Sequence, residues 1–221
     1  MARITYHGHS GFSVRTVQRL LVFDYLGTGL NDPEPSDRAI AFISHAHSDH
    51  NHPIVQGWAR QGLCHLVEGD DVHGAGFAMR PGDSTVIEGA IVRAFGSTDQ
   101  GVSFWVESNA LKVLHAGDFN LWHWRGEGNA DWTRRAEREF EAILKTMEGL
   151  PVDVAFFPVD PRMGEGADEG ALRFVERIRP KLIIPMHFWD QPRAAERFAE
   201  QKLPEGTRAV ALTEPGAWIE V

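Results

Sequence analysis

The segment from Ala39 to His50 constrains the fold more than any other part of this 221-residue chain. It begins with the apolar run AIAFIS and ends with HAHSDH, which places His45, His47, Asp49 and His50 close together in the sequence. An apolar run of this kind is typical of a strand that delivers polar side chains to a sheet edge. Imidazole and carboxylate groups are the ligands that zinc and similar divalent ions use, and groups this dense need partners when buried. The segment therefore predicts a metal site, and the alternative is a polar loop rich in histidine.

Composition restricts the partners and the location of the protein. The chain has 22 Lys and Arg against 31 Asp and Glu, a formal net charge of -9, and its basic residues do not cluster, which disfavours a nucleic acid backbone as partner. Its single cysteine, Cys64, lies in an apolar run and is expected to be a core residue in a reducing compartment. The first residues lack the pattern of a signal peptide, and no apolar run approaches the ~18 residues of a membrane span. We therefore predict a cytoplasmic protein that binds a small-molecule substrate, no nucleic acid and no membrane, and we leave a homo-oligomer open.

Hydrophobic patterning predicts many strands, with helices concentrated in the second half of the chain. Strands are expected at 4–6, 11–14, 20–24, 39–44, 63–67, 84–87, 90–95, 102–106, 111–114, 152–157, 182–184, 209–212 and 218–221. Helices are expected at 52–60, from 131 to before Gly149, at 168–179 and at 192–200. A meander followed by alternating strands and helices, twice over, predicts an α/β (α+β) protein with two sheets and helices on their outer faces. At this length we expect one domain, residues 1–221.

Two later strands also end on residues that can bind metals. The run KVL leads into His115-Ala116-Gly117-Asp118, and LIIPM leads into His187. Strand ends are where α/β folds place their sites. Three strand ends are therefore expected to converge on one metal centre.

The chain resembles the metallo-β-lactamase-fold hydrolases, and more closely the small members related to the ascorbate-6-phosphate lactonases. The resemblance rests on GHSGF starting at Gly8, on HAHSDH as the HxHxDH motif, on the AGD that ends at Asp118, and on IPMHF around His187. These motifs follow one another in family order along essentially the whole chain. The resemblance implies a four-layer αβ/βα sandwich of two mixed sheets with helices on the outer faces.

The resemblance also implies a set of metal ligands and a reaction. It assigns His45 and His47 to one metal, Asp49, His50 and His187 to a second, and Asp118 to a bridge between them. Two cations that share a carboxylate and a water would lower the pKa of that water enough to form hydroxide near neutral pH. The hydroxide would attack a carbonyl or phosphorus centre, and Asp49 would act as the catalytic residue that orients the nucleophile or shuttles its proton.

One expected ligand is missing from the sequence. Relatives carry a metal-binding His between the HxHxDH and GD motifs, about where this chain has Gly96. Extra water could fill the first position, Asp99 could substitute for the missing ligand, or a single ion could bind at the second position. We expect the second position to be the more complete one, with zinc as the metal and manganese or iron as alternatives, in one or two ions.

Several other residues are candidates for supporting the ligands or contacting substrate. His9 lies in the GHS element, His115 lies three residues before Asp118, and Arg162 is the first candidate for binding an anionic group. The aromatic segment after Asp118 contains Trp122 and His123, which either clamp a substrate or plug the core beneath a loop.

These residues together predict an enzyme, a metal-dependent hydrolase of small ester, lactone or phosphoester substrates. The alternative is a non-catalytic metal-binding or sensing protein with a degenerate first metal site, because fold resemblance alone does not establish chemistry.

Overall fold

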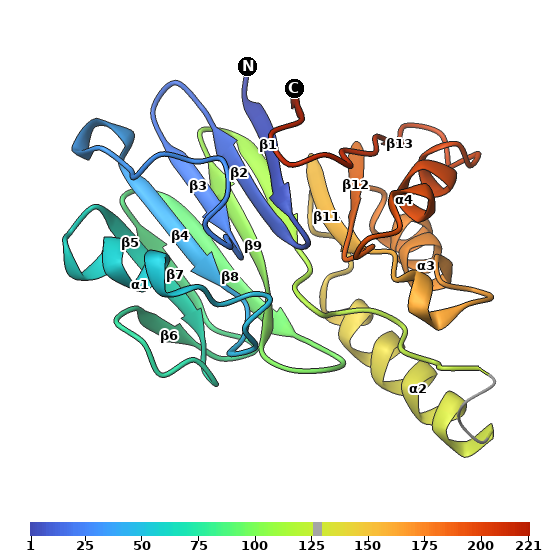
Figure 1. Cartoon of the computed structure of the whole chain (residues 1–221). Helices are drawn as coiled ribbons and strands as arrows, with labels where there is room; N and C mark the ends of the chain where they lie inside the picture. The colour runs from blue at the N-terminus through green and yellow to red at the C-terminus, as the bar shows by residue number, and fades with distance from the viewer. Residues whose placement is uncertain (126–129) are drawn as a thin grey trace.

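The computed structural model describes residues 1–125 and 130–221, and its strands form two mixed sheets that face each other (Figure 1). The first sheet has the order β14-β1-β2-β3-β4-β5-β6 and the second the order β13-β12-β11-β10-β9-β8-β7. The strands of the first sheet are β1 (Arg3–Gly8), β2 (Gly11–Arg15), β3 (Leu20–Phe23), β4 (Ala39–Ile43), β5 (Cys64–Gly69), β6 (Phe77–Met79) and β14 (Trp218–Glu220). Those of the second are β7 (Ser84–Ile87), β8 (Ala90–Gly96), β9 (Val102–Ser108), β10 (Leu111–His115), β11 (Val154–Pro158), β12 (Leu182–Met186) and β13 (Arg208–Ala209).

The two sheets share one pattern of strand directions. In the first sheet, β14, β1, β2 and β3 pair antiparallel, and β4, β5 and β6 continue parallel to β3. In the second, β7 to β10 pair antiparallel, and β11, β12 and β13 continue parallel to β10. Parallel neighbours bring their carboxyl ends to the same edge. Each sheet therefore presents a row of strand ends followed by loops.

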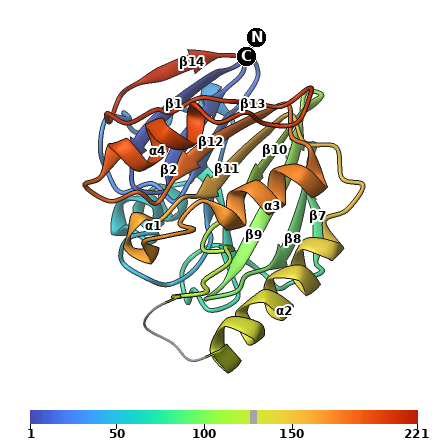
Figure 2. The ribbon, with the colours of Figure 1, turned by 90° about the vertical axis from the view of Figure 1, so that its right-hand side faces the viewer.

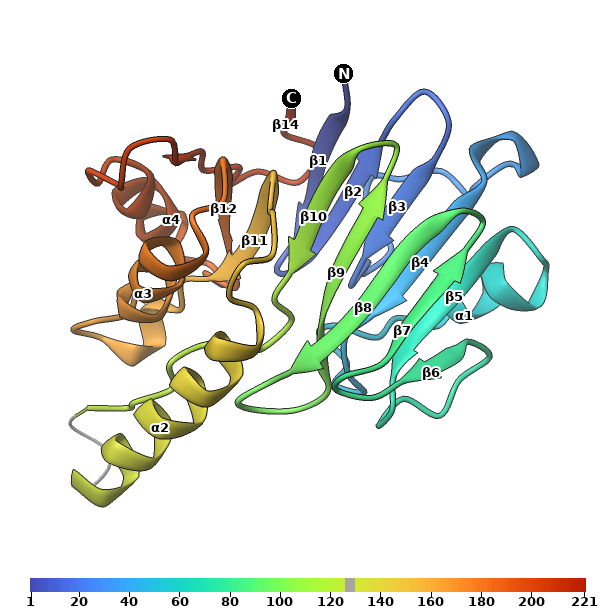
Figure 3. The ribbon, with the colours of Figure 1, turned by 180° about the vertical axis from the view of Figure 1, so that it is seen from behind.

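Helices cover the outer face of each sheet. Helix α1 (Pro53–Arg60) contacts β5 of the first sheet. Helices α2 (Ala130–Thr146), α3 (Glu169–Ile178) and α4 (Pro192–Ala199) contact β8, β11 and β12 of the second. Figure 2 shows these three helices in front of the second sheet, and Figure 3 shows α1 on the opposite side of the molecule. This arrangement confirms the predicted sandwich of two mixed sheets with helices outside.

Aromatic side chains fill the space between the sheets. Phe12 of the first sheet stacks on Phe156 of the second with ring centroids 4.1 Å apart, and Phe42 contacts Phe104 at 5.3 Å. Burial of such rings contributes much of the stability of a core. A second apolar cluster lies between the first sheet and α1, where Trp58 stacks on Tyr25. Both faces of the central strands are therefore buried, which explains the continuous apolar run of β4.

The structure corrects the sequence predictions at two sheet edges. Strand β6 was not predicted, because two of its three residues, Phe77 and Ala78, are exposed and show no apolar alternation. The strand expected at 209–212 is limited to Arg208–Ala209, although Val210 still donates a backbone hydrogen bond to Ile183. None of the helices in the described residues is long and apolar enough to cross a membrane.

Candidate metal centre

The loops after β4, β10 and β12 meet the β1–β2 turn at one edge of the sandwich. His45, Asp49 and His50 come from the first of these loops, Asp118 from the second and His187 from the third. His9 comes from the β1–β2 turn, and its carbonyl oxygen accepts a hydrogen bond of 3.2 Å from the backbone amide of His187. The three strand ends therefore lie together, and a fourth segment joins them.

The carboxylate of Asp118 lies at the centre of this group. Its Oδ1 is 3.1 Å from His50 Nε2 and 3.3 Å from His187 Nε2, and its Oδ2 is 3.4 Å from His45 Nε2. One oxygen thus faces His50 and His187 while the other faces His45. A carboxylate placed in this way has the geometry needed to bridge two cations.

Asp24, at the end of β3, orients two of these histidines. Parallel pairing of β3 with β4 places it beside Ser44, whose amide and hydroxyl donate to its two oxygens at 2.8 and 2.7 Å. His50 Nδ1 lies 2.7 Å from Asp24 Oδ2, and His45 Nδ1 lies 3.0 Å from Ser44 Oγ. When Nδ1 carries the proton and donates it to these partners, Nε2 is left free to bind a metal.

Asp160, after β11, does the same for His187. The side chain of Asp160 is fully buried, and its Oδ2 is 3.0 Å from His187 Nδ1. Arg162 donates hydrogen bonds to the same carboxylate from its Nε and Nη2 groups. Burial opposes ionisation, but His187 and Arg162 outweigh it and hold the pKa of Asp160 well below its usual range. The carboxylate is therefore charged at neutral pH and holds the ring of His187 in place.

Four buried polar atoms at the centre have no hydrogen-bond partner among the described residues. They are His9 Nε2, His50 Nε2, His187 Nε2 and Asp118 Oδ1. An unsatisfied buried polar atom costs about 1–3 kcal/mol, so four in one place call for a missing partner. Imidazole nitrogens and a carboxylate oxygen are the donor set that zinc prefers. The residues present therefore fit a divalent metal ion.

The charges at the centre are strongly coupled. Burial disfavours the imidazolium form of His50, but the carboxylates of Asp24 and Asp118 outweigh this and raise its pKa to about 10. The same contacts act on Asp118: burial opposes its ionisation, and His187 and His50 hold its pKa well below its usual range. Burial is the main cause of the lowered pKa values of His9 and His45. In the metal-free protein His50 is therefore protonated at pH 7, whereas burial favours the neutral form of His9 and His45.

The possible ligands fall into three overlapping groups, within each of which the ligand atoms lie no more than 4.8 Å apart. One contains His9, Asp49, His50 and His187, another His45, His50 and Asp118, and the third His45, His47 and Asp49. His45 thus belongs to two groups, and His47, which is exposed, to one. The group around His187 has the most ligands.

The structure also shows the surroundings of Gly96. A β-carbon at this position would lie 3.4 Å from Ile143 Cγ1 of α2, so a side chain here would start against that helix. Asp99, the proposed substitute, is exposed and lines a cavity that also contains Asp118 and His187. Asp99 therefore lines the same cavity as the central Asp118.

Comparisons with known proteins identify the family of this chain. The beta-lactamase superfamily domain matches residues 3–131, more than half of the chain. The chain belongs to the beta-lactamase superfamily. It is 25% identical over 244 residues to a metal-dependent hydrolase of Thermococcus onnurineus, with 100% of both chains covered. It is 27% identical over 258 residues to a metal-dependent hydrolase of Opitutus terrae, with 99% of this chain and 100% of the relative covered.

A solved structure shows the same superfamily fold. Igni18, a metallo hydrolase from Ignicoccus hospitalis, superposes with a TM-score of 0.68 at 19% identity, covering 99% of this chain and 97% of that one. The family resemblance inferred from the motifs is thus confirmed, and the lactonase-like subgroup stays a prediction.

Within this superfamily fold, the remaining candidates take different places. His115 is buried and lies 2.8 Å from the carbonyl oxygen of Ser10, and His123 is buried with its Nε2 3.2 Å from the carbonyl oxygen of Gly166. Among the described residues, neither belongs to a group of possible ligands. Trp122 donates from Nε1 to the carbonyl oxygen of Asp118 at 2.8 Å, so it supports the backbone of the central carboxylate.

The cavity beside Asp118 is small and aromatic. Its volume is about 190 Å³, and its lining consists of Thr98, Asp99, Asp118, Trp122, Trp124, Trp132, Arg162 and His187. The guanidinium carbon of Arg162 lies 4.4 Å from the ring centroid of Trp189 and 5.9 Å from that of Trp124. The guanidinium group of Arg162 is therefore held in place among the residues that line this cavity.

The sequence analysis overlooked two supporting residues, Asp24 and Asp160. Asp24 was only counted in the strand expected at 20–24, and Asp160 was not singled out although Arg162, two residues later, was. Each of them directly follows an apolar run, and Asp118 and His187 also lie close after the end of an apolar run. An acidic residue at the end of a buried strand was therefore the signal that could have identified them.

Proposed function

We propose that this chain is a metal-dependent hydrolase that cleaves a small ester, lactone or phosphoester carrying an anionic group. The observation that carries the proposal is a set of four buried ligand atoms with no hydrogen-bond partner among the described residues: His9 Nε2, His50 Nε2, His187 Nε2 and Asp118 Oδ1. A structural core has no reason to collect so many unsatisfied ligand atoms, or to orient the Nε2 atoms of His45, His50 and His187 towards one carboxylate. The names of the curated relatives support the same enzyme class.

Zinc is the metal that these ligands suit best, because the set consists of histidine nitrogens and carboxylate oxygens. When bound, the ion supplies a hydroxide nucleophile near neutral pH and polarises the oxygen under attack. We assign His50, Asp118 and His187 to its binding at the second position, with Asp49 beside them, and His45 and His47 to the first position. Gly96 adds no ligand, so we propose that the His187 side binds more tightly.

Asp49 is the residue that we assign to proton handling. Its side chain is partly exposed, and its Oδ2 lies 3.4 Å from His9 Nε2. The interaction with His9 is the largest of the causes that hold the pKa of Asp49 well below its usual range. The carboxylate is therefore ionised at neutral pH and is able to accept a hydrogen bond from a nucleophile.

Arg162 and the tryptophans indicate the kind of substrate. Arg162 uses Nε and Nη2 on Asp160, and among the described residues its Nη1 makes no hydrogen bond. A guanidinium group at the cavity wall binds carboxylate or phosphate oxygens, and the indole rings of Trp122 and Trp124 bury the apolar part of a ligand. We therefore propose a small anionic substrate, handled without nucleic acid or membrane.

The first test compares chelator-treated protein with zinc-loaded protein on generic ester, lactone and phosphodiester substrates. We expect turnover only in the zinc-loaded sample, and its loss in His50→Ala. His65→Ala is the matched control, because His65 is exposed and remote from the centre and should leave turnover unchanged. Zinc binding without turnover on any of these substrates would favour the non-catalytic metal sensor.

The second test concerns the anionic group. We compare kcat/KM for an anionic ester with that for a neutral ester of the same shape, in the parent protein and in Arg162→Gln. Loss of a charge-assisted hydrogen bond should lower the preference for the anionic ester roughly 10- to 100-fold. Arg162→Lys should retain part of it. An unchanged ratio in Arg162→Gln would exclude this role for Arg162.

A further inference from the structure

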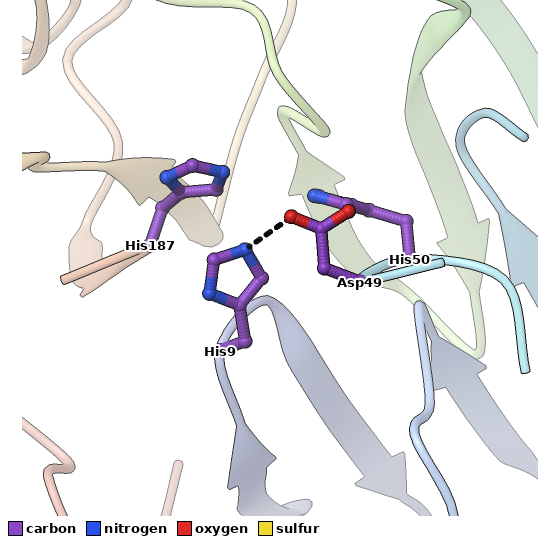
Figure 4. Close-up of side chains that lie close together, drawn as sticks. All are labelled: His9, Asp49, His50 and His187. Carbon is purple, nitrogen blue, oxygen red and sulfur yellow. Dashed lines mark ion pairs between the residues drawn. The ribbon is translucent and has the colours of Figure 1, made fainter. Parts of the chain in front are cut away.

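His9 is held within reach of three residues already assigned to the metal. Figure 4 shows its imidazole projecting from the β1–β2 turn towards Asp49, with His50 and His187 on either side. Its ring centroid lies 4.2 Å from that of His187 and 5.4 Å from that of His50. The ligand atoms of all four residues lie within 4.8 Å of one another. Only small movements are needed for them to surround one ion.

His9 directs its Nε2 towards the carboxylate of Asp49, itself a possible metal ligand, whose Oδ2 lies 3.4 Å away. Its Nε2 is buried and, among the described residues, lacks a hydrogen-bond partner, as do the Nε2 atoms of His50 and His187. By contrast, His7, two residues earlier, has both ring nitrogens occupied, Nδ1 by the carbonyl of Thr28 and Nε2 by Ser13 Oγ. His7 is therefore satisfied as a core residue, whereas His9 has a buried nitrogen that could bind a ligand.

The backbone at His9 is held in a costly conformation. His9 has φ of 48° and His187 has φ of 63°, and the amide of His187 donates to the carbonyl of His9. A left-handed backbone costs an L-residue with a β-carbon about 1–2 kcal/mol, and glycine would avoid this cost. Strain retained at two facing histidines is a recognised feature of functional sites. Both turns therefore present an imidazole where glycine would be the relaxed choice.

We infer that His9 is itself a ligand of the metal bound by Asp49, His50 and His187. This inference rests on the proposed metal-dependent function and deepens it. Three imidazoles and one carboxylate are the ligand types that zinc takes, and Asp118 Oδ1 lies beside them, 3.1 Å from His50 Nε2. The β1–β2 turn thereby supplies a histidine to a centre that lacks one at Gly96, although at the other metal position.

The test measures metal binding rather than activity. His9→Gly relieves the left-handed backbone, and His9→Asn retains a residue that tolerates it. We measure the zinc Kd by competition with a chelator, and count histidine ligands by X-ray absorption at the zinc edge. Replacing residues that only support a ligand costs 10- to 100-fold in affinity, so removing a direct ligand should weaken binding by about 100-fold or more. The spectrum should show one histidine fewer.

The controls separate this inference from the proposed function. His7→Asn, two residues earlier on β1, should leave the Kd within about threefold and the histidine count unchanged, since both His7 nitrogens are bonded within the protein. Metal-free His9→Gly should unfold at the same temperature as the metal-free parent or higher, which shows that the variant folds. If both His9 variants bind zinc like the parent with the same histidine count, His9 is not a ligand. If the parent itself binds no divalent ion, the proposed function fails first.

Discussion

Asp24 Oδ2 lies 2.7 Å from His50 Nδ1, and both side chains are almost completely buried. The same oxygen accepts the hydroxyl hydrogen bond of Ser44, which in turn lies 3.0 Å from His45 Nδ1. One carboxylate at the end of β3 therefore orients two histidines of the neighbouring strand's loop. We therefore expect metal binding to depend on this carboxylate, although Asp24 belongs to none of the groups of possible ligands found among the described residues.

Replacing Asp24 should weaken metal binding without removing a ligand. Asp24→Asn keeps the volume but loses the charge that fixes the His50 ring, and losses of such supporting groups typically cost 10- to 100-fold in metal affinity. The zinc Kd from chelator competition measures the effect. Asp37→Asn is the control, because Asp37 pairs with Arg15 at the surface, where ion pairs contribute about 0–1 kcal/mol. Equal Kd values for the two variants would contradict this role of Asp24.

Removing the Ser44 hydroxyl should destabilise the protein. Ser44→Ala leaves His45 Nδ1 without its partner and deprives Asp24 of a donor in a buried network. A buried polar group left unsatisfied costs about 1–3 kcal/mol, which urea unfolding of metal-free protein resolves. Ser48→Ala in the same loop is exposed and should change the free energy of unfolding by less than about 0.5 kcal/mol. A loss no larger than that of Ser48→Ala would show that the network contributes little.

The pH dependence of stability should reverse when metal binds. The folded-state pKa of His50 is raised to about 10, so its contribution is fully present below its unfolded pKa of about 6.5 and is lost as pH rises through about 10. Metal-free protein should therefore melt at progressively lower temperature across this window. Zinc requires deprotonated His50, so its affinity should rise over the same window.

Two measurements check this expectation. The first measurement is the melting temperature of chelator-treated protein as a function of pH. The parent protein should lose more stability with rising pH than His50→Gln. Calorimetry of zinc binding in buffers of different ionisation enthalpy should detect proton release near pH 7.5. Zinc binding with no proton release would show that His50 is already neutral.

Gly101 should be irreplaceable for steric reasons. Its φ is +68°, and a β-carbon would lie 2.1 Å from the carbonyl oxygen of Ser44 and 2.5 Å from His45 Cβ. Gly101→Ala should therefore cost about 2–4 kcal/mol or more and displace His45. Gly149 also has a left-handed backbone, φ +79°, but open space around it, so Gly149→Ala should cost only about 1–2 kcal/mol. Similar losses in urea unfolding would mean that the Gly101 loop moves freely.

The sequence predicts most of the strands and the ligand-bearing loops because buried strands and the HxHxDH pattern are local signals. It does not show that β3 pairs parallel with β4 with Phe23 opposite Phe42, and this register is what brings Asp24 to Ser44. The left-handed turn at His9 and its contact with His187 join residues far apart in the chain, so no local pattern reveals them. Strand β6 was missed because it is short and largely exposed.

The centre takes its ligands from both sheets, with His9, Asp49 and His50 on one side and Asp118 and His187 on the other. An ion bound there ties the two halves of the sandwich together. By mass action, free metal at 100 times its Kd would add about 2.7 kcal/mol to the free energy of unfolding. The supply of metal would then set the resistance of the protein to proteolysis as well as its catalytic rate. When metal is scarce, the inactive metal-free molecules would be degraded first.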